Sequence, residues 1–158
     1  MPRADTPTTA TLPATGTSRK GTNSALTGLL RAADVVRRRL SATLEPRGIT
    51  LQQYNVLRIL RGAHPQPLAT YEVADRMLEQ TPGVTRLLDR IEQSGWAERS
   101  RSRADRRLME CHITAAGLAL LGELDDDVRA ADESALGDLS ERELGSLTAL
   151  LHRIERAP

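Results

Sequence analysis

The hydrophobic period of this 158-residue chain changes in the middle of residues 81–114, and that change limits the fold more than any other feature. In "TPGVTRLLDRIEQSG" large apolar residues recur every three or four positions, the spacing of one face of an α-helix. In "WAERSRS" and "RRLMECHIT" apolar and polar residues alternate, the spacing of β-strands. The segment therefore predicts an amphipathic helix that leads directly into a two-stranded hairpin with the charged tip "RAD".

The predicted helix carries signals at both ends. Thr81 is the expected N-cap, Pro82 suits the first helical position because its missing N–H costs little there, and Gly95 suits the C-terminal stop. The apolar stripe consists of Val84, Leu87, Leu88 and Ile91. The positions left for solvent or a partner are Pro82, Gly83, Thr85, Arg86, Asp89 and Arg90.

Three helices are expected before this segment. Apolar residues at helical spacing from Ser24 to Leu44 predict a long helix that Pro46 and Gly48 terminate. Thr50 with Gln53 forms a capping-box pattern that opens a second helix, and residue 62 closes it. Its expected buried face is Leu51, Tyr54, Leu57 and Leu60, and Thr70 is the expected N-cap of a third helix of roughly two turns.

Two helices are expected after the hairpin. One begins at Thr114 with Leu118, Leu121, Leu124 and Val128 on one face, and the polar run "DDDVRAADES" is expected to interrupt it. Ser140 and Glu143 form a second capping-box pattern, which opens the last helix. Long apolar helical faces in a chain without phenylalanine favour pairing between two copies as a symmetric dimer. The expected dimerisation residues are Leu26, Leu29, Leu144, Leu147, Leu151 and Ile154.

Composition favours one mainly α domain inside the cell. The single cysteine excludes an intramolecular disulfide framework, and the chain shows neither a signal-peptide pattern nor an apolar run of the ~20 residues that span a bilayer. A cytoplasmic protein without membrane contact is therefore expected. Residues 1–23 are rich in Thr, Pro, Ala and Gly and predict a flexible arm, whose Arg3, Arg19 and Lys20 would suit phosphate contacts.

The formal net charge of +1 conceals an uneven distribution. Residues 1–61 carry ten basic and three acidic side chains, whereas residues 114–158 carry four and ten. Arginine supplies all basic residues except Lys20, a bias that genomic base composition alone can produce, so arginine abundance by itself indicates no function. An enzyme is not indicated either, because no glycine-rich phosphate loop occurs and Ser94 and Ser100 lack a nucleophile motif.

The order of elements is that of a winged helix-turn-helix, in which a helix enters the DNA major groove and a hairpin reaches the neighbouring groove and backbone. Thr81, Gly83 and Thr85 are small enough to let the helix N-terminus approach double-stranded DNA closely. Arg86 and Arg90 lie one turn apart and suit phosphate or guanine contacts.

The chain from about residue 24 to residue 156 resembles the multiple antibiotic resistance regulators, the MarR family of bacterial transcription factors. "ADRRLMECHIT" is similar to the wing motif of that family, with Asp105, Arg107, Ile113 and Thr114 at its characteristic positions. "TPGVTRLLDRIEQSGW" is similar to its recognition helix, and "ITLQQYNVL" to the start of the helix at residue 50.

The resemblance implies a homodimeric repressor that binds a palindromic operator and that a small-molecule effector can release. It divides the chain into the arm at 1–23, an N-terminal dimerisation helix at 24–48, a DNA-binding lobe at 49–113 and C-terminal dimerisation helices at 114–158. Asp105 would brace the wing while its arginines approach the minor groove, where negative potential is concentrated. The wing residues so implied are Arg101, Arg103, Asp105, Arg106 and Arg107, with Arg107 ranked first.

Two other functions remain open at this stage. A winged-helix module that binds protein would show weak salt dependence, and a non-specific architectural DNA binder would show no preferred sequence. Arg86 and Arg90 also have a purely structural alternative, because Asp89, Glu92 or Glu79 could pair with them.

No cofactor or metal site is expected. Cys111 lies in ordinary strand alternation, which favours a packed, inert thiol, and His112 beside it points to the opposite face, so the two cannot easily share an ion. Asp125, Asp126 and Asp127 fan out around a helix and are expected to form a solvated face away from DNA. Trp96 and Tyr54 are better explained by packing than by ligand binding, and no effector-binding residue is assigned.

Overall fold

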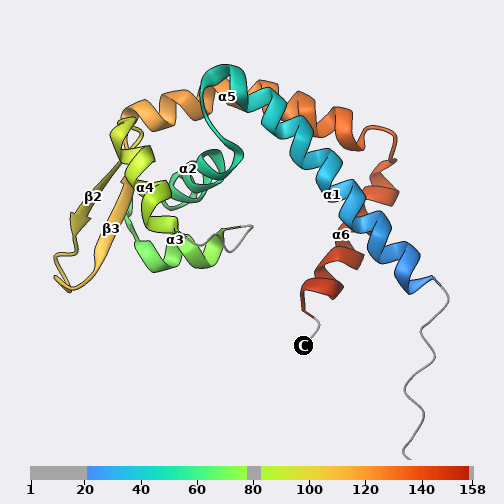
Figure 1. The fold of residues 1–158 in the computed structure, drawn as a ribbon, viewed down its shortest axis with the longest axis horizontal. Coiled ribbons are helices and arrows are strands. Elements are labelled where there is room, and N and C mark those ends of the chain that lie inside the picture. The colour runs from blue at the N-terminus through green and yellow to red at the C-terminus, as the bar shows by residue number, and fades with distance from the viewer. Residues whose placement is uncertain (1–20, 78–82, 157–158) are drawn as a thin grey trace, which may run out of the picture.

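The computed structural model describes residues 21–77 and 83–156, and it confirms a mainly helical chain with a small sheet (Figure 1). A lobe built from α2, α3, α4 and the sheet lies at one end, and α1, α5 and α6 extend away from it. The elements in chain order are α1 (Thr22–Leu44), a 3-10 turn (Glu45–Arg47), α2 (Leu51–Ala63), β1 (Leu68–Ala69), α3 (Thr70–Arg76), α4 (Val84–Gln93), β2 (Ala97–Arg101), β3 (Met109–Ile113), α5 (Ala115–Leu136) and α6 (Glu141–Glu155).

The predicted capping signals are present at several helix ends. Thr50 and Gln53 form the capping box of α2, and Ser140 and Glu143 form that of α6. At the end of α4, Gly95 adopts φ 73°, which glycine tolerates without strain. The N–H groups of Gly95 and Trp96 donate to the carbonyls of Glu92 (2.9 Å) and Ile91 (3.1 Å), the two bonds of a Schellman motif. This motif fixes the direction in which the chain leaves α4 towards β2.

Two predicted helix starts are not where the structure has them. Ala69, not Thr70, is the N-cap of α3: the Glu72 carboxylate accepts the Ala69 N–H at 2.8 Å, and the Thr70 hydroxyl donates to the Met109 carbonyl at 3.1 Å. The Thr70 hydroxyl, which the sequence pattern assigned to the cap of α3, is therefore bonded to β3 instead. Helix α4 begins at Val84 with Gly83 at its N-cap, while the predicted cap residues Thr81 and Pro82 lie outside the described residues.

The sheet has three strands rather than the two predicted, in the order β1-β3-β2 with both pairs antiparallel. Strands β2 and β3 pair from Ala97 opposite Ile113 to Arg101 opposite Met109. The added strand β1 has two residues, which pair with Cys111 and Glu110. Two residues are too few to show an alternating pattern, so β1 forms because the loop after α2 meets the free edge of β3.

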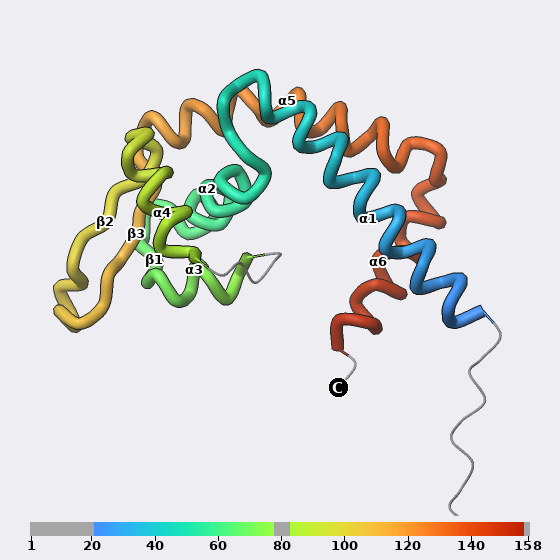
Figure 2. The backbone as a smooth tube through the Cα atoms, viewed as in Figure 1, coloured from blue at the N-terminus to red at the C-terminus, as the bar shows by residue number. Residues whose placement is uncertain are grey.

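Helix α5 is continuous, and the predicted interruption at "DDDVRAADES" does not occur. The run holds no glycine or proline, its charged side chains are exposed or paired, and Val128 is buried against the core, so nothing breaks the helix before Leu136. Leu121 and Leu124 are fully buried in the core of the lobe. Farther along, α5 runs beside α1 (Figure 2), and Arg39 of α1 donates to the Ser134 carbonyl at 2.6 Å.

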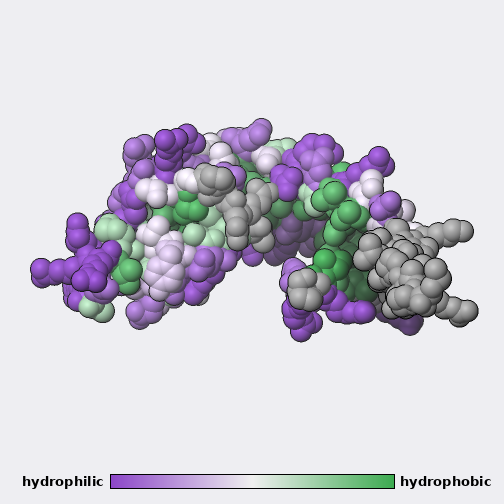
Figure 3. Space-filling model, turned by 60° about the horizontal axis from the view of Figure 1, so that its bottom comes forward, coloured by the Kyte–Doolittle hydropathy of each residue, from purple (hydrophilic) through white to green (hydrophobic). Residues whose placement is uncertain are grey.

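The apolar faces of α1 and α6 are largely uncovered in the single chain. Among the described residues only Leu44 of α1 is buried, and no side chain of α6 is. Leu26, Leu30, Leu150 and Ile154 are 55%, 63%, 52% and 58% exposed. Hydrophobic residues accordingly gather on the surface that α1 and α6 form (Figure 3).

Gly117 marks the tightest approach between α5 and the hairpin. A Cβ at this position would lie 2.2 Å from the Trp96 carbonyl oxygen and 2.8 Å from Ile113 Cγ1. We expect Gly117→Ala to lower the free energy of unfolding by about 1–3 kcal/mol, because backbone must move to admit the methyl group. Chemical denaturation monitored by circular dichroism measures the change.

Gly122 supplies the matched control on the same helix, since a Cβ there would meet nothing within 4 Å. Gly122→Ala should leave the protein as stable as wild type or stabilise it by up to ~1 kcal/mol through helix propensity. Equal stability of the two variants would contradict the close packing of α5 on the Trp96 carbonyl.

Candidate nucleic-acid interface

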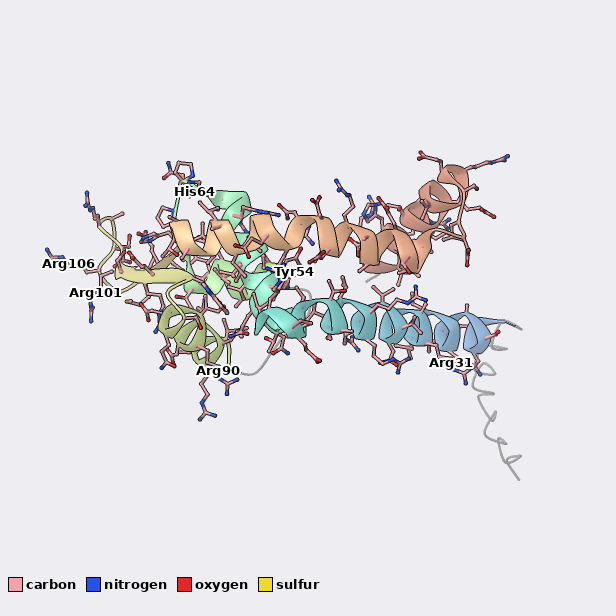
Figure 4. The ribbon with its side chains drawn as sticks, turned by 90° about the horizontal axis from the view of Figure 1, so that it is seen from above. Arg31, Tyr54, His64, Arg90, Arg101 and Arg106 are labelled. Carbon is pink, nitrogen blue, oxygen red and sulfur yellow. The ribbon has the colours of Figure 1, made fainter. Side chains whose placement is uncertain are left out.

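The exposed side of α4 presents small and basic residues. Leu87, Leu88 and Ile91 are buried as predicted, which fixes the rotation of the helix. Gly83, Thr85, Arg86 and Arg90 are consequently exposed, and Arg90 projects away from the lobe (Figure 4). No ion pair to Arg86 or Arg90 occurs among the described residues, so their guanidinium groups are available to an anion.

The two acidic residues of α4 point to a different partner. Arg99 on β2 donates from Nε to Glu92 Oε2 at 2.9 Å and from Nη2 to the same oxygen at 2.6 Å, and Nη2 also bonds Asp89 Oδ1. Hydrogen bonds from Arg99 hold the pKa of Glu92 below its usual value, and the carboxylates raise the pKa of Arg99.

This arrangement bears on two expectations from the sequence. Asp89 was expected to face solvent or a partner, and its side chain is 42% exposed, but its carboxylate bonds Arg99. The pairing of Arg86 or Arg90 with Asp89 or Glu92 does not occur in the structure. The reason is the hairpin, which brings Arg99 against both carboxylates. Arg99 lies beyond the end of α4 in the sequence, so the i, i+3 and i, i+4 spacing of a helix does not indicate this contact. The remaining proposed partner, Glu79, lies outside the described residues.

The loop between β2 and β3, residues 102–108, is braced by its own polar groups. Asp105 Oδ1 accepts the Arg107 N–H at 2.9 Å, and the Asp105 carbonyl accepts the Leu108 N–H at the same distance. Ser102 is buried, and its hydroxyl accepts the Ala104 N–H at 3.2 Å. Ser102 was not among the residues singled out from the sequence, although a serine two residues before an exposed turn position is a known turn former.

The wing tip carries arginines at four positions. Arg103, Arg106 and Arg107 are exposed, and within residues 83–156 no carboxylate pairs with them. Arg101 donates to the Arg106 carbonyl at 3.0 Å, and both side chains project from the tip (Figure 4). Four other arginines of the lobe pair with carboxylates: Arg47 with Glu123 and Asp127, Arg61 with Asp125, Arg76 with Glu72, and Arg99 with Asp89 and Glu92. Arg58 lies over the Tyr54 ring.

The acidic run of α5 is exposed as expected, but it is also paired. Asp125 bonds Arg61 at 2.9 Å, Asp127 lies 3.8 Å from Arg47, and Asp126 bonds Arg129 at 2.6 Å. The three carboxylates thus point in different directions. In the part of the chain that the structure describes, no three His, Cys, Asp or Glu residues come together as a metal site would require.

Cys111, His112, Tyr54 and Trp96 are each explained by packing or by a contact with a neighbouring side chain. Cys111 is fully buried, and burial raises the pKa of its thiol. His112 faces the other side of β3, with Nε2 3.3 Å from Glu98 Oε2. Tyr54 is buried, and the Arg58 guanidinium carbon lies over its ring, 5.9 Å from the ring centroid. Trp96 packs on the core at the base of the hairpin.

Comparison with known proteins agrees with this geometry. A model of the MarR family matches residues 47–108. A crystal structure of a MarR transcription factor from Planctomyces limnophilus is 37% identical, with a TM-score of 0.66, over 83% of this chain and 95% of that one. The chain belongs to the MarR family.

Two further relatives share most of their length with this member of the MarR family. The HTH-type transcriptional regulator PecS of Dickeya dadantii (strain 3937) is 28% identical over 130 residues, which are 81% of this chain and 78% of PecS. A mutant MarR from E. coli, crystallised with operator DNA, is 24% identical with a TM-score of 0.76, over 87% of this chain and 99% of that one, and shares the fold.

The MarR model spans the residues from the 3-10 turn to the wing, where the candidate interface lies. The helices α1, α5 and α6 lie outside the residues that the family model matches, whereas the comparison with the Planctomyces limnophilus structure extends over 83% of the chain.

Among the described residues no helix has the length and apolar character needed to cross a membrane.

We expect Cys111 to be unreactive in the native protein. Its sulfur has no exposed surface and its raised pKa keeps the thiolate scarce, so a chromogenic disulfide reagent should label it only as fast as the protein unfolds. The measurement compares labelling at neutral pH with and without denaturant. Rapid stoichiometric labelling of native protein would show that the thiol is accessible and would reopen a redox role.

Proposed function

We propose that this MarR-family protein is a homodimeric repressor that binds a palindromic operator through α4 and the wing. The observation that carries the proposal is the separation of compensated from uncompensated arginines within the lobe. Arg86 and Arg90 on α4 and Arg103, Arg106 and Arg107 on the wing have no described carboxylate partner. Arg47, Arg61, Arg76 and Arg99 pair with carboxylates, and Arg58 lies over the Tyr54 ring. Uncompensated cations on adjacent protruding elements suit a polyanion that presents phosphates at regular intervals.

Helix α4 is the element proposed to enter the major groove. Its N-terminal end is formed by Gly83, which adopts φ 103° and has no side chain to keep the backbone from a phosphate. Thr85 follows as a small polar group, and Arg86 and Arg90 stand one turn apart on the exposed side. Thr81 and Pro82 complete the proposed reading surface.

The wing is proposed to reach the adjacent minor groove. The Arg107 and Leu108 N–H groups donate to the side chain and the carbonyl of Asp105, so the arginine side chains extend from an ordered turn. Guanidinium groups suit a narrow minor groove because negative potential is concentrated there. Arg107 is the first candidate, with Arg106, Arg103 and Arg101 beside it.

The dimer is proposed to form through α1 and α6. Helix α6 is 15 residues long with no buried side chain in the described chain, so its apolar face contributes little to the stability of one copy. Leu26 and Ile154 are more than half exposed, and Leu29, Leu144, Leu147 and Leu151 are half-buried. Pairing these faces across a two-fold axis would remove them from water and set two lobes at a fixed separation.

The proposal includes release by a small-molecule effector, which rests on the family resemblance. Binding near the junction of α1, α5 and the lobe would favour a spacing of the two α4 helices that no longer matches grooves one helical turn, about 34 Å, apart. No residue is assigned to that site.

Selection of bound duplexes from a random pool is the test of the function. We expect a two-fold-symmetric consensus of roughly 16 to 20 base pairs, consistent with two half-sites one turn apart. Affinity for it should fall steeply with salt and exceed that for a scrambled duplex. Binding without sequence preference would identify an architectural DNA binder instead, and no enrichment would favour a protein-binding module.

The wing assignment is tested on the same consensus. Arg107→Ala should raise the Kd at least about tenfold through loss of a minor-groove cation, with an unchanged melting temperature. Arg129→Ala is the control, because this exposed arginine lies on α5 and is paired with Asp126. Normal operator binding by Arg107→Ala would refute the assignment.

The dimer is tested by sedimentation at micromolar protein. We expect wild type to sediment as a dimer and the double variant Leu26→Glu/Ile154→Glu to sediment as a monomer, since each substitution places charge in the proposed interface. Both positions are exposed in the single chain, so the lobe should retain its circular dichroism spectrum. A wild-type protein that is monomeric under these conditions would exclude the proposed dimer.

A further inference from the structure

Arg99 joins the hairpin to the exposed helix of the lobe. It lies in β2 opposite Cys111, and its side chain is 20% exposed. Its guanidinium contacts Asp89 and Glu92 of α4, and its own N–H donates to Glu92 Oε1 at 3.1 Å. A single residue of the wing therefore occupies both acidic side chains of the helix.

The two carboxylates would otherwise lie beside the surface proposed to meet DNA. At about 100° per residue, Asp89 falls between Thr85 and Arg86 around the axis of α4, on the exposed side. Without Arg99, Asp89 would be free to pair with Arg86 at i, i+3 spacing, and Glu92 would be left with a negative charge and no partner. Either change would weaken attraction to a phosphate backbone.

We propose that Arg99 is a positioning residue for DNA recognition: it holds Asp89 and Glu92 towards β2, so that the exposed side of α4 offers Arg86 and Arg90 uncompensated. This inference rests on the function proposed above and adds a residue that need not touch DNA. Arginine suits the role because its planar fork can donate to two carboxylates at once, which the single ammonium of lysine does less well.

The experiment measures Kd for the selected operator by fluorescence anisotropy, with the melting temperature of each variant recorded. Arg99→Gln should raise the Kd at least about tenfold, because it exposes two like charges to the phosphates. The triple variant Arg99→Gln/Asp89→Asn/Glu92→Gln lacks the same ion pairs but has no carboxylates to expose. Its affinity should recover most of the loss, even though the bonds between β2 and α4 are not restored.

A matched control separates this effect from net charge. Arg99→Gln/Asp126→Asn/Glu133→Gln has the same formal charge as the first triple variant, but its neutralised residues lie on α5, away from α4. It should bind as weakly as Arg99→Gln alone. Recovery in both triple variants would reduce the effect to net charge and overturn the inference.

The other outcomes are equally decisive. If neither triple variant recovers affinity, Arg99 serves only the stability of the lobe and the inference is wrong. If Arg99→Gln binds like wild type, the carboxylates do not influence recognition and the inference is wrong while the proposed function stands. If wild-type protein binds no duplex, the proposed function fails and the inference fails with it.

Discussion

Burial of Leu121 and Leu124 in the core of the lobe is the interaction on which the rest of the structure depends. Both side chains are fully buried, and they belong to a helix whose other half runs beside α1. One continuous helix, α5, therefore packs against the core of the lobe at one end, and at the other end it runs beside α1 and leads into α6. Because a packed core deforms little, the direction in which α5 leaves the lobe is fixed where these two leucines are buried.

The surface charge of the lobe depends on which arginines are paired with carboxylates rather than on the net charge of the chain. Carboxylates of α5 bond Arg47, Arg61 and Arg129, and the two acidic residues of α4 bond Arg99. The pairs of Arg47 and Arg61 lie at the surface, where ion pairs contribute little to stability, about 0–1 kcal/mol each. Their larger effect is on the surface of the lobe, where α4 and the wing tip keep exposed arginines that have no described carboxylate partner.

Local sequence rules located most elements because the local interactions are strong here. The capping boxes of α2 and α6 and the glycine stop after α4 were predicted from short patterns, and the hairpin and the apolar stripe of α4 from hydrophobic period. The predictions failed where a distant segment intervened. The Thr70 hydroxyl bonds the Met109 carbonyl instead of capping α3, and β1 forms by pairing with β3. Helix α5 continues through the polar run that was expected to interrupt it.

The sequence by itself determined which residues are arginine, which helices are amphipathic, and the motif order that places the chain in its family. These properties follow from neighbours within a few positions, which helical and strand spacing reports directly. Only the tertiary structure decided which arginines remain uncompensated. Asp89 and Glu92 look available to Arg86 and Arg90 by spacing, yet they bond Arg99, because the Schellman turn at Gly95 folds β2 back against α4. Charge pairing depends on distance in space, and that distance was set by the turn.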